Sequence, residues 1–169
     1  MKVYGTGGNM DIIKALEMLK KLELKMEDLY GHYHRLFFYD AEAAGIFLLL
    51  QAEEKSHAGL IDYQIRMARR NRDIFQDVEY DTAPLEHLIS GIEEAIKTAE
   101  SVTVERAIEF SIQVEKSACE YHYRTLIVES NPEMEELVKN LGSSDQMHAD
   151  TLRSLSERVT RIQKSPDKP

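Results

Sequence analysis

QAEEKSHAGL, residues 51–60, places an acid and a histidine in the middle of an apolar helical pattern. Glu54 and His57 share one stripe with the apolar residues that recur every three or four positions, namely Ile46, Leu50, Ile61 and Ile65. Residues three apart lie on the same helix face, so this carboxylate and this imidazole point in one direction. With 30 acidic residues and 6 histidines in 169 residues, about one acid-x-x-His pair is expected by chance. The rest of the chain must decide whether the pair binds a metal.

The second half of the chain repeats the pattern. SDQMHADTL (144–152) aligns with EEKSHAGL (53–60) and matches Glu54 with Asp145 and His57 with His148. Before each pair, EDLYGHYHRLF (27–37) aligns with EKSACEYHYRTL (115–126) and matches a lone glutamate in each half, Glu27 with Glu115. The offsets are 88 and 91 residues, so a loop or turn must absorb three residues. The matches fall on polar positions within apolar stripes, which favours an internal repeat over chance similarity between amphipathic helices.

The periodicity predicts an all-α chain. Long helices begin at about Asp11, Asp40 and Thr103, and SNPE (130–133) separates the third from the fourth. Residues 72–84 are long and rich in turn formers, which indicates a crossover, and a shorter helix is expected at about 84–99. The pattern predicts that residues 10–162 form a four-helix bundle, with one long crossover between the second and third long helices. Residues 1–9 are expected to be a flexible lead and residues 163–169 a flexible tail, and no strand is expected.

Composition narrows the classes of partner. The net charge is −9, which disfavours binding to nucleic acid and anionic lipid. Cys119 is the single cysteine, so neither an internal disulfide nor a Cys-x-x-Cys metal site can form within this sequence. We therefore expect a cytoplasmic protein without a membrane-spanning segment.

The two halves together supply two lone glutamates and two acid-x-x-His pairs, the ligand set of dimetal carboxylate bundles. Four carboxylates carry −4, and two divalent ions would balance them. Without metal, four carboxylates facing a core would be costly to desolvate or would take up protons.

On these residues the chain resembles the rubrerythrin-like branch of the ferritin-like superfamily. The resemblance covers about residues 10–160 and rests on Glu27 with Tyr33, EEKSH, Glu115 with Tyr121, and DQMH. It implies a ferritin-like bundle that binds two metal ions, most simply iron, with manganese or zinc as alternatives. The ligands it implies are Glu27, Glu54, His57, Glu115, Asp145 and His148.

The sequence departs from the family at three points. Asp145 stands where the family has glutamate and is one methylene shorter. The rubredoxin-like domain is absent, so a redox cycle needs an external electron donor. His34 and His122 stand where tyrosine is common; they are candidate alternative ligands or outer partners, beside the simpler interpretation of hydrogen-bonded bundle residues.

Glu23 competes with Glu27. It lies one turn earlier on the same face, and its spacing to Glu54 is closer to that between Glu115 and Asp145. The local match to Glu115 favours Glu27. We interpret Tyr33 and Tyr121 as packing residues and Cys119 as a small core residue.

The resemblance implies non-haem di-iron chemistry on peroxide or dioxygen. The alternatives are a metal-handling bundle without turnover and a metal-free helical interaction module. Apolar residues outside the core stripes, Phe38, Phe47 and Leu48, together with the resemblance, predict a homodimer.

Overall fold

The computed structural model describes residues 8–164, and the side chains within that range except those of residues 8–9, 80, 100, 118–122 and 162–164. This part of the chain is mostly helical, as predicted. Its helices are α1 (Ile12–Leu36), α2 (Ala41–Arg70), α3 (Ala83–Thr98), α4 (Val104–Glu115), α5 (Ala118–Ser130) and α6 (Glu135–Lys164). Two short strands, β1 (Gly8–Met10) and β2 (Val78–Tyr80), and three 3-10 turns join them.

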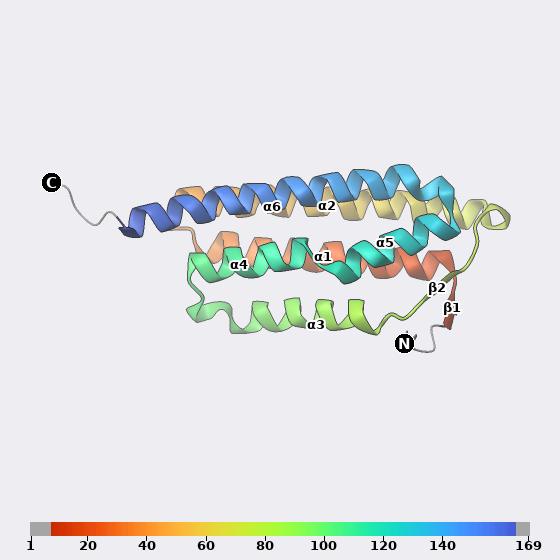
Figure 1. Ribbon diagram of the computed structural model, residues 1–169, viewed down its shortest axis with the longest axis horizontal. Coiled ribbons are helices and arrows are strands. Elements are labelled where there is room, and N and C mark those ends of the chain that lie inside the picture. Colours follow the sequence, from red (N-terminus) through yellow and green to blue (C-terminus); the bar gives the residue numbers. More distant parts are fainter. Residues whose placement is uncertain (1–7, 165–169) are drawn as a thin grey trace, which may run out of the picture.

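Helices α1 and α2 form an antiparallel hairpin whose ends match the sequence signals (Figure 1). The Asp11 carboxylate accepts a hydrogen bond from Ile13 N at 2.7 Å and caps the start of α1. Asp40 caps α2 by accepting from the backbone N–H groups of Glu42 and Ala43. A tight four-residue connection, 37–40, therefore fixes how far α2 is shifted along α1.

The crossover after α2 is more ordered than the sequence suggested. β2 pairs antiparallel with β1, so that Met10 faces Val78 and Gly8 faces Tyr80. Gly8 and Asn9 therefore lie in a strand rather than in a flexible lead, and residues 1–7 and 165–169 lie outside the described range. Strands of three residues, about 70 positions apart, are too short to show an alternating pattern. α3 then lies where the sequence predicts a short helix.

The third long helix is broken. α4 ends at Glu115 and α5 begins at Ala118, whereas the sequence predicts one continuous helix. Lys116 N still donates to Ile112 O, and Ser117 then adopts the extended backbone of an N-cap position. Neither proline nor glycine occupies the break. Glu115 therefore stands at the end of one helix and beside the start of the next.

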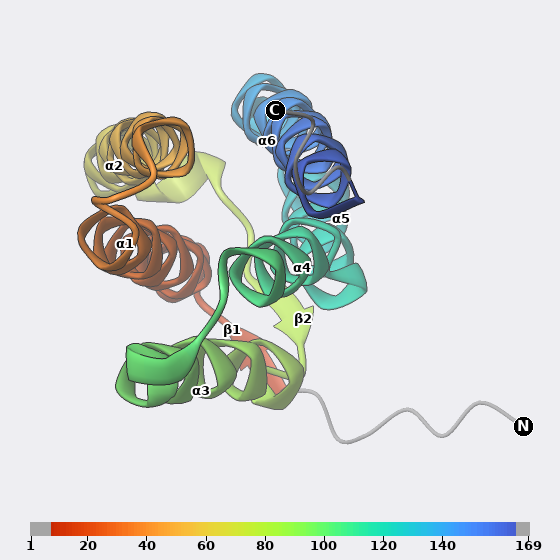
Figure 2. The same ribbon diagram turned by 90° about the vertical axis from the view of Figure 1, so that its left-hand side faces the viewer.

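Seen along the helices, α1 and α2 lie on one side and α4, α5 and α6 on the other, with α3 beside α1 (Figure 2). The core between them is apolar and aromatic, with Tyr33, Phe37 and Phe47 in mutual ring contact. Phe47 is fully buried, so it is not available for the dimer contact predicted for it, whereas Phe38 is 79% exposed. In the described part of the chain, no helix is both long and apolar enough to cross a membrane.

Candidate metal centre

The first group of ligating side chains comes from the α1–α2 hairpin. Glu23 stands 13 residues before Leu36, where α1 ends, and Glu54 stands 13 residues after Ala41, where α2 begins. Both helices rise by about 1.5 Å per residue, so these two glutamates lie level across the hairpin. His57 Nδ1 lies 3.2 Å from Glu54 Oε2 and 3.4 Å from Glu23 Oε2. Glu23, Glu54 and His57 thus meet in one buried place.

A second group shares Glu54 with the first. His148 Nδ1, from α6, lies 3.0 Å from Glu54 Oε1 and 3.3 Å from Glu115 Oε1. The side chains of these three residues are at most 2% exposed. The His57 and His148 rings stack with their centroids 5.6 Å apart. The two oxygens of Glu54 therefore face two different histidines, one in each half of the repeat.

The separations fit ligands of a metal ion. Two atoms that each lie about 2.1 Å from one ion are at most about 4.2 Å apart. The nitrogen–oxygen separations of 3.0–3.4 Å meet this limit in both groups. Imidazole nitrogen with carboxylate oxygen suits iron, manganese or zinc. Either group of buried side chains could hold a metal ion.

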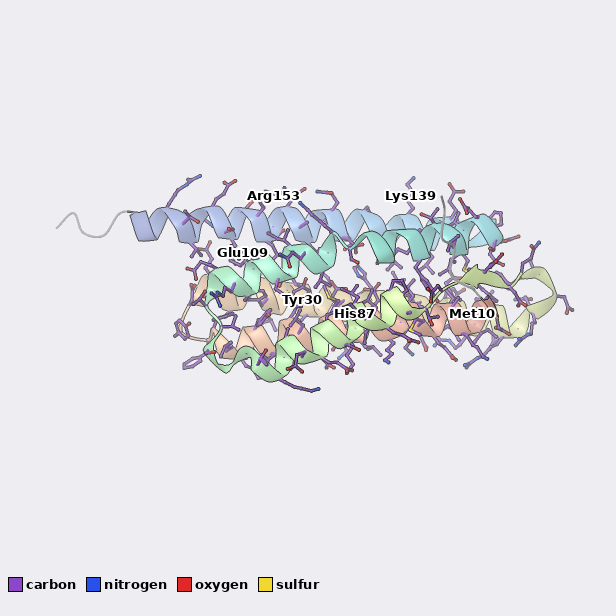
Figure 3. The ribbon with its side chains drawn as sticks, turned by 60° about the horizontal axis from the view of Figure 1, so that its bottom comes forward. Met10, Tyr30, His87, Glu109, Lys139 and Arg153 are labelled. Carbon is purple, nitrogen blue, oxygen red and sulfur yellow. The ribbon has the colours of Figure 1, made fainter. Side chains whose placement is uncertain are left out.

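Outer partners orient the second group. The outer nitrogen of His148, Nε2, lies 2.7 Å from Glu53 Oε2 and 3.3 Å from Ser144 Oγ. A proton on Nε2 that is shared with Glu53 leaves Nδ1 to face Glu54 and Glu115. The Tyr30 hydroxyl donates to Glu115 Oε1. Tyr30 is labelled in Figure 3, midway along the molecule.

Asp145 lies beside these groups but belongs to neither of them. Its carboxylate pairs with the guanidinium of Arg124, whose other nitrogen, Nη2, lies 3.0 Å from Glu23 Oε1. Arg124 is 4% exposed. The residue that the resemblance implies as a sixth ligand is therefore engaged in an ion pair with Arg124.

Burial and mutual contact shift the pKa values in this cluster. Burial raises the pKa of Glu23 to about 7, although its hydrogen bond with His57 opposes the rise. Burial alone would lower the pKa of His57, but its hydrogen bonds to Glu23 and Glu54 outweigh this and raise the pKa to about 10. The same competition, with Glu115 and Glu54 as partners, raises the pKa of His148 to about 11. The metal-free cluster therefore holds protons at neutral pH.

The other candidate residues lie elsewhere. Glu27 is half-buried one turn from Glu23 and lies in neither group, so the structure favours Glu23, which the sequence analysis ranked second. His34 Nδ1 hydrogen-bonds to the Ala44 carbonyl oxygen at 2.9 Å. This agrees with the simpler interpretation of His34 as a hydrogen-bonded residue of the bundle. Tyr33 packs in the aromatic core. The side chains of Cys119, Tyr121 and His122 lie outside the described residues.

Sequence reasoning missed Arg124. It follows Glu115 by nine residues, and at 3.6 residues per turn an unbroken helix would place it about half a turn away from the glutamate's face. The break at Lys116–Ser117 changes that phase. The sequence analysis did not single out Tyr30 either, although a buried tyrosine hydroxyl needs a polar partner. Glu53 carried no signal, because its role depends on α6.

A pocket of about 650 Å³ leads to the cluster from the helix break. Glu115 and Asp145 are part of its wall, together with Arg124, and α6 contributes apolar Val138 and Ala149. Lys139, another lining residue, is labelled on α6 in Figure 3. The pocket therefore borders the second group at Glu115.

Comparison with known proteins adds no family to this picture. No protein-family model matches the chain, and neither a curated protein nor a solved structure matches it significantly.

Proposed function

We propose that the chain is a dimetal carboxylate protein of the rubrerythrin type, built on a ferritin-like four-helix bundle. The observation that carries the proposal is Glu54, which presents one oxygen to His57 and the other to His148. A carboxylate placed in this way can bridge two ions. Glu23 with His57 would complete one metal position, and Glu115 with His148 the other.

The ions are proposed to be iron, and the substrate hydrogen peroxide or dioxygen. A reduced iron pair would supply two electrons to such an oxidant. The chain's own residues would hold the ligands: Tyr30 orients Glu115, Glu53 orients His148, and Arg124 holds Glu23. The pocket beside Glu115 would admit a small oxidant. As the resemblance to rubrerythrins implies, electrons would come from an external donor protein.

Anaerobic loading with Fe(II), followed by rapid mixing with peroxide, tests the proposal. We expect close to two ions per chain and oxidation within the mixing experiment. Glu23→Gln should lose one ion, and the matched control Glu27→Gln, one turn away on the same helix, should keep both. Loss of metal in Glu27→Gln with none in Glu23→Gln would overturn the ligand set. No tight binding would favour a metal-free helical module.

The Arg124–Asp145 pair supports a second candidate, metal binding without turnover. Because the guanidinium holds Asp145, one carboxylate fewer is free to follow changes in the charge of the metal. Two ions bound per chain with no rapid oxidation by peroxide would favour this iron-handling role.

A homodimer in the cytoplasm remains part of the proposal. Phe38, Leu48 and Leu49 are large apolar side chains that are 79%, 48% and 53% exposed. Sedimentation that shows only a 19.5 kDa species at micromolar concentration would count against the dimer.

A further inference from the structure

Arg124 makes the electrostatic surroundings of the two proposed metal positions different. Its guanidinium lies between α1 and α6, where Nη2 donates to Glu23 Oε1 at 3.0 Å and Nη1 pairs with Asp145. The side chain of Arg124 is 5% exposed, so water screens its charge little. A fixed positive charge is thus hydrogen-bonded directly to one candidate ligand, Glu23, in the group that also contains Glu54 and His57.

The position at Glu115 has the opposite surroundings. The outer partner of Glu115 is the neutral hydroxyl of Tyr30. His148 is supported by an anion, since Glu53 lies 2.7 Å from its outer nitrogen. A carboxylate on the far nitrogen of a histidine raises its strength as a metal ligand. Both glutamates therefore have one oxygen engaged, Oε1 in each case, but the partner of Glu23 is a cation and the partner of Glu115 is neutral.

We infer that the two positions bind metal in a fixed order, with the position at Glu115 and His148 filling first, and that Arg124 is the positioning residue that sets this order. The inference rests on the proposed function. A buried unit charge one carboxylate away from a divalent ion repels it strongly, because the effective dielectric constant between buried groups is low. This repulsion should separate the two dissociation constants by about tenfold or more.

Titration of the wild-type protein with Zn(II), followed by NMR of its histidine side chains, tests the order without any variant having to fold. Zn(II) is not oxidised, so the readout is independent of activity. The first equivalent should shift the His148 ring signals, and the second the His57 signals. His34, which bonds Ala44 O outside the cluster, should not move and is the control within the sample. Parallel shifts of His57 and His148, or His57 moving first, would overturn the order.

Two substitutions test the part played by Arg124. Arg124→Gln removes the charge but keeps a polar side chain and should reduce the separation between the two dissociation constants to a few-fold. Arg124→Lys keeps the charge and should restore at least tenfold. An unchanged separation in a folded Arg124→Gln protein, with circular dichroism like that of the wild type, would overturn the assignment to Arg124. Complete absence of Zn(II) binding would overturn the proposed function itself, whereas two ions bound with equal affinity would overturn only the inference.

Discussion

Metal binding at this site should release protons, and their number follows from the pKa values of the ligating side chains. His57 and His148, with pKa values of about 10 and 11, are both protonated in the metal-free protein at pH 7. Glu23, with a pKa of about 7, is about half protonated there. Ligation needs the free lone pair of an imidazole and an ionised carboxylate, so metal displaces these protons. Two divalent ions should therefore release about two and a half protons at pH 7.

The magnitude separates this cluster from an ordinary pair of histidines. At the usual histidine pKa of about 6.5, two imidazoles would together release only about half a proton at pH 7. At pH 8.5 the expected release falls to about two, because Glu23 is then ionised while both histidines still hold their protons. Raising the pH should strengthen binding, since fewer protons compete, until the pH passes the histidine pKa values.

Calorimetric titration with Zn(II) in buffers of different ionisation enthalpy counts these protons directly. Glu23→Gln, which should bind one ion fewer, should release about one and a half protons less at pH 7, because neither the Glu23 proton nor the His57 proton is then displaced, and Glu27→Gln should behave like the wild type. A release below one proton in the wild type, at full occupancy of two ions, would refute the account of a protonated cluster.

Three further predictions concern stability. Protons bound by Glu23, His57 and His148 stabilise the metal-free fold fully at pH values below the pKa values that these groups have in the unfolded chain. This stability is lost progressively as the pH rises to about 7 for Glu23 and to about 10 and 11 for the histidines. The melting midpoint of the metal-free protein should therefore be lower at pH 9 than at pH 5, and that of the Zn(II)-loaded protein should change less. Tyr30→Phe removes the hydrogen bond to Glu115 and should lower the free energy of unfolding in urea by about 1.5–3 kcal/mol. The matched change Tyr33→Phe in the aromatic core should lower it less, and equal losses would contradict the role of the Tyr30 hydroxyl. In Gly45→Ala the new Cβ meets open space, and the free energy of unfolding should rise by about 0.5–1 kcal/mol. In Gly31→Ala the new Cβ would lie 2.7 Å from Gln51 Nε2, so the gain should be smaller or become a loss. An equal gain in both variants, measured by urea unfolding, would show that the Gln51 side chain moves freely.

The faces of the helices were predictable from the sequence, and so were several of their ends. Asp11, Asp40 and Thr103 cap helices where the sequence placed helix starts, because side-chain capping is a local interaction. Glu54 and His57 share a face because periodicity alone fixes which residues point together.

The periodicity of the sequence did not determine which residues of neighbouring helices lie at the same height along the helix axis. Glu23 and Glu27 share a face, and the choice between them depends on how α1 and α2 align lengthwise. Counting from the two ends of the 37–40 connection places Glu23, and not Glu27, level with Glu54. The signal existed in the sequence, but only once the hairpin loop was located to within one residue, which is the least certain part of a sequence-based assignment.

The break between α4 and α5 was beyond the reach of pattern reasoning, because no proline or glycine marks it. Its consequence is large: it brings Arg124 to the face that carries Glu115, and so adds a cation that a continuous helix would point elsewhere. Local periodicity assumes an unbroken helix, so after a change of phase in the middle of a helix the pattern no longer fixes which later residues share a face.

Arg124 also changes the charge balance expected from the sequence. Four carboxylates and two divalent ions alone would sum to zero. The guanidinium adds +1 and the Glu53 carboxylate beside His148 adds −1, so the fully loaded cluster again sums to zero. With one ion bound and one histidine still protonated, the same groups sum to −1. In the metal-free state, with both histidines protonated, they sum to −2 before the partial protonation of Glu23 is counted. The first ion therefore meets a more negative cluster than the second and should bind more tightly. The net charge of the cluster therefore favours unequal loading, as do the contacts of Glu23. The protons on the histidines and on Glu23 are the charges that the metal ions replace.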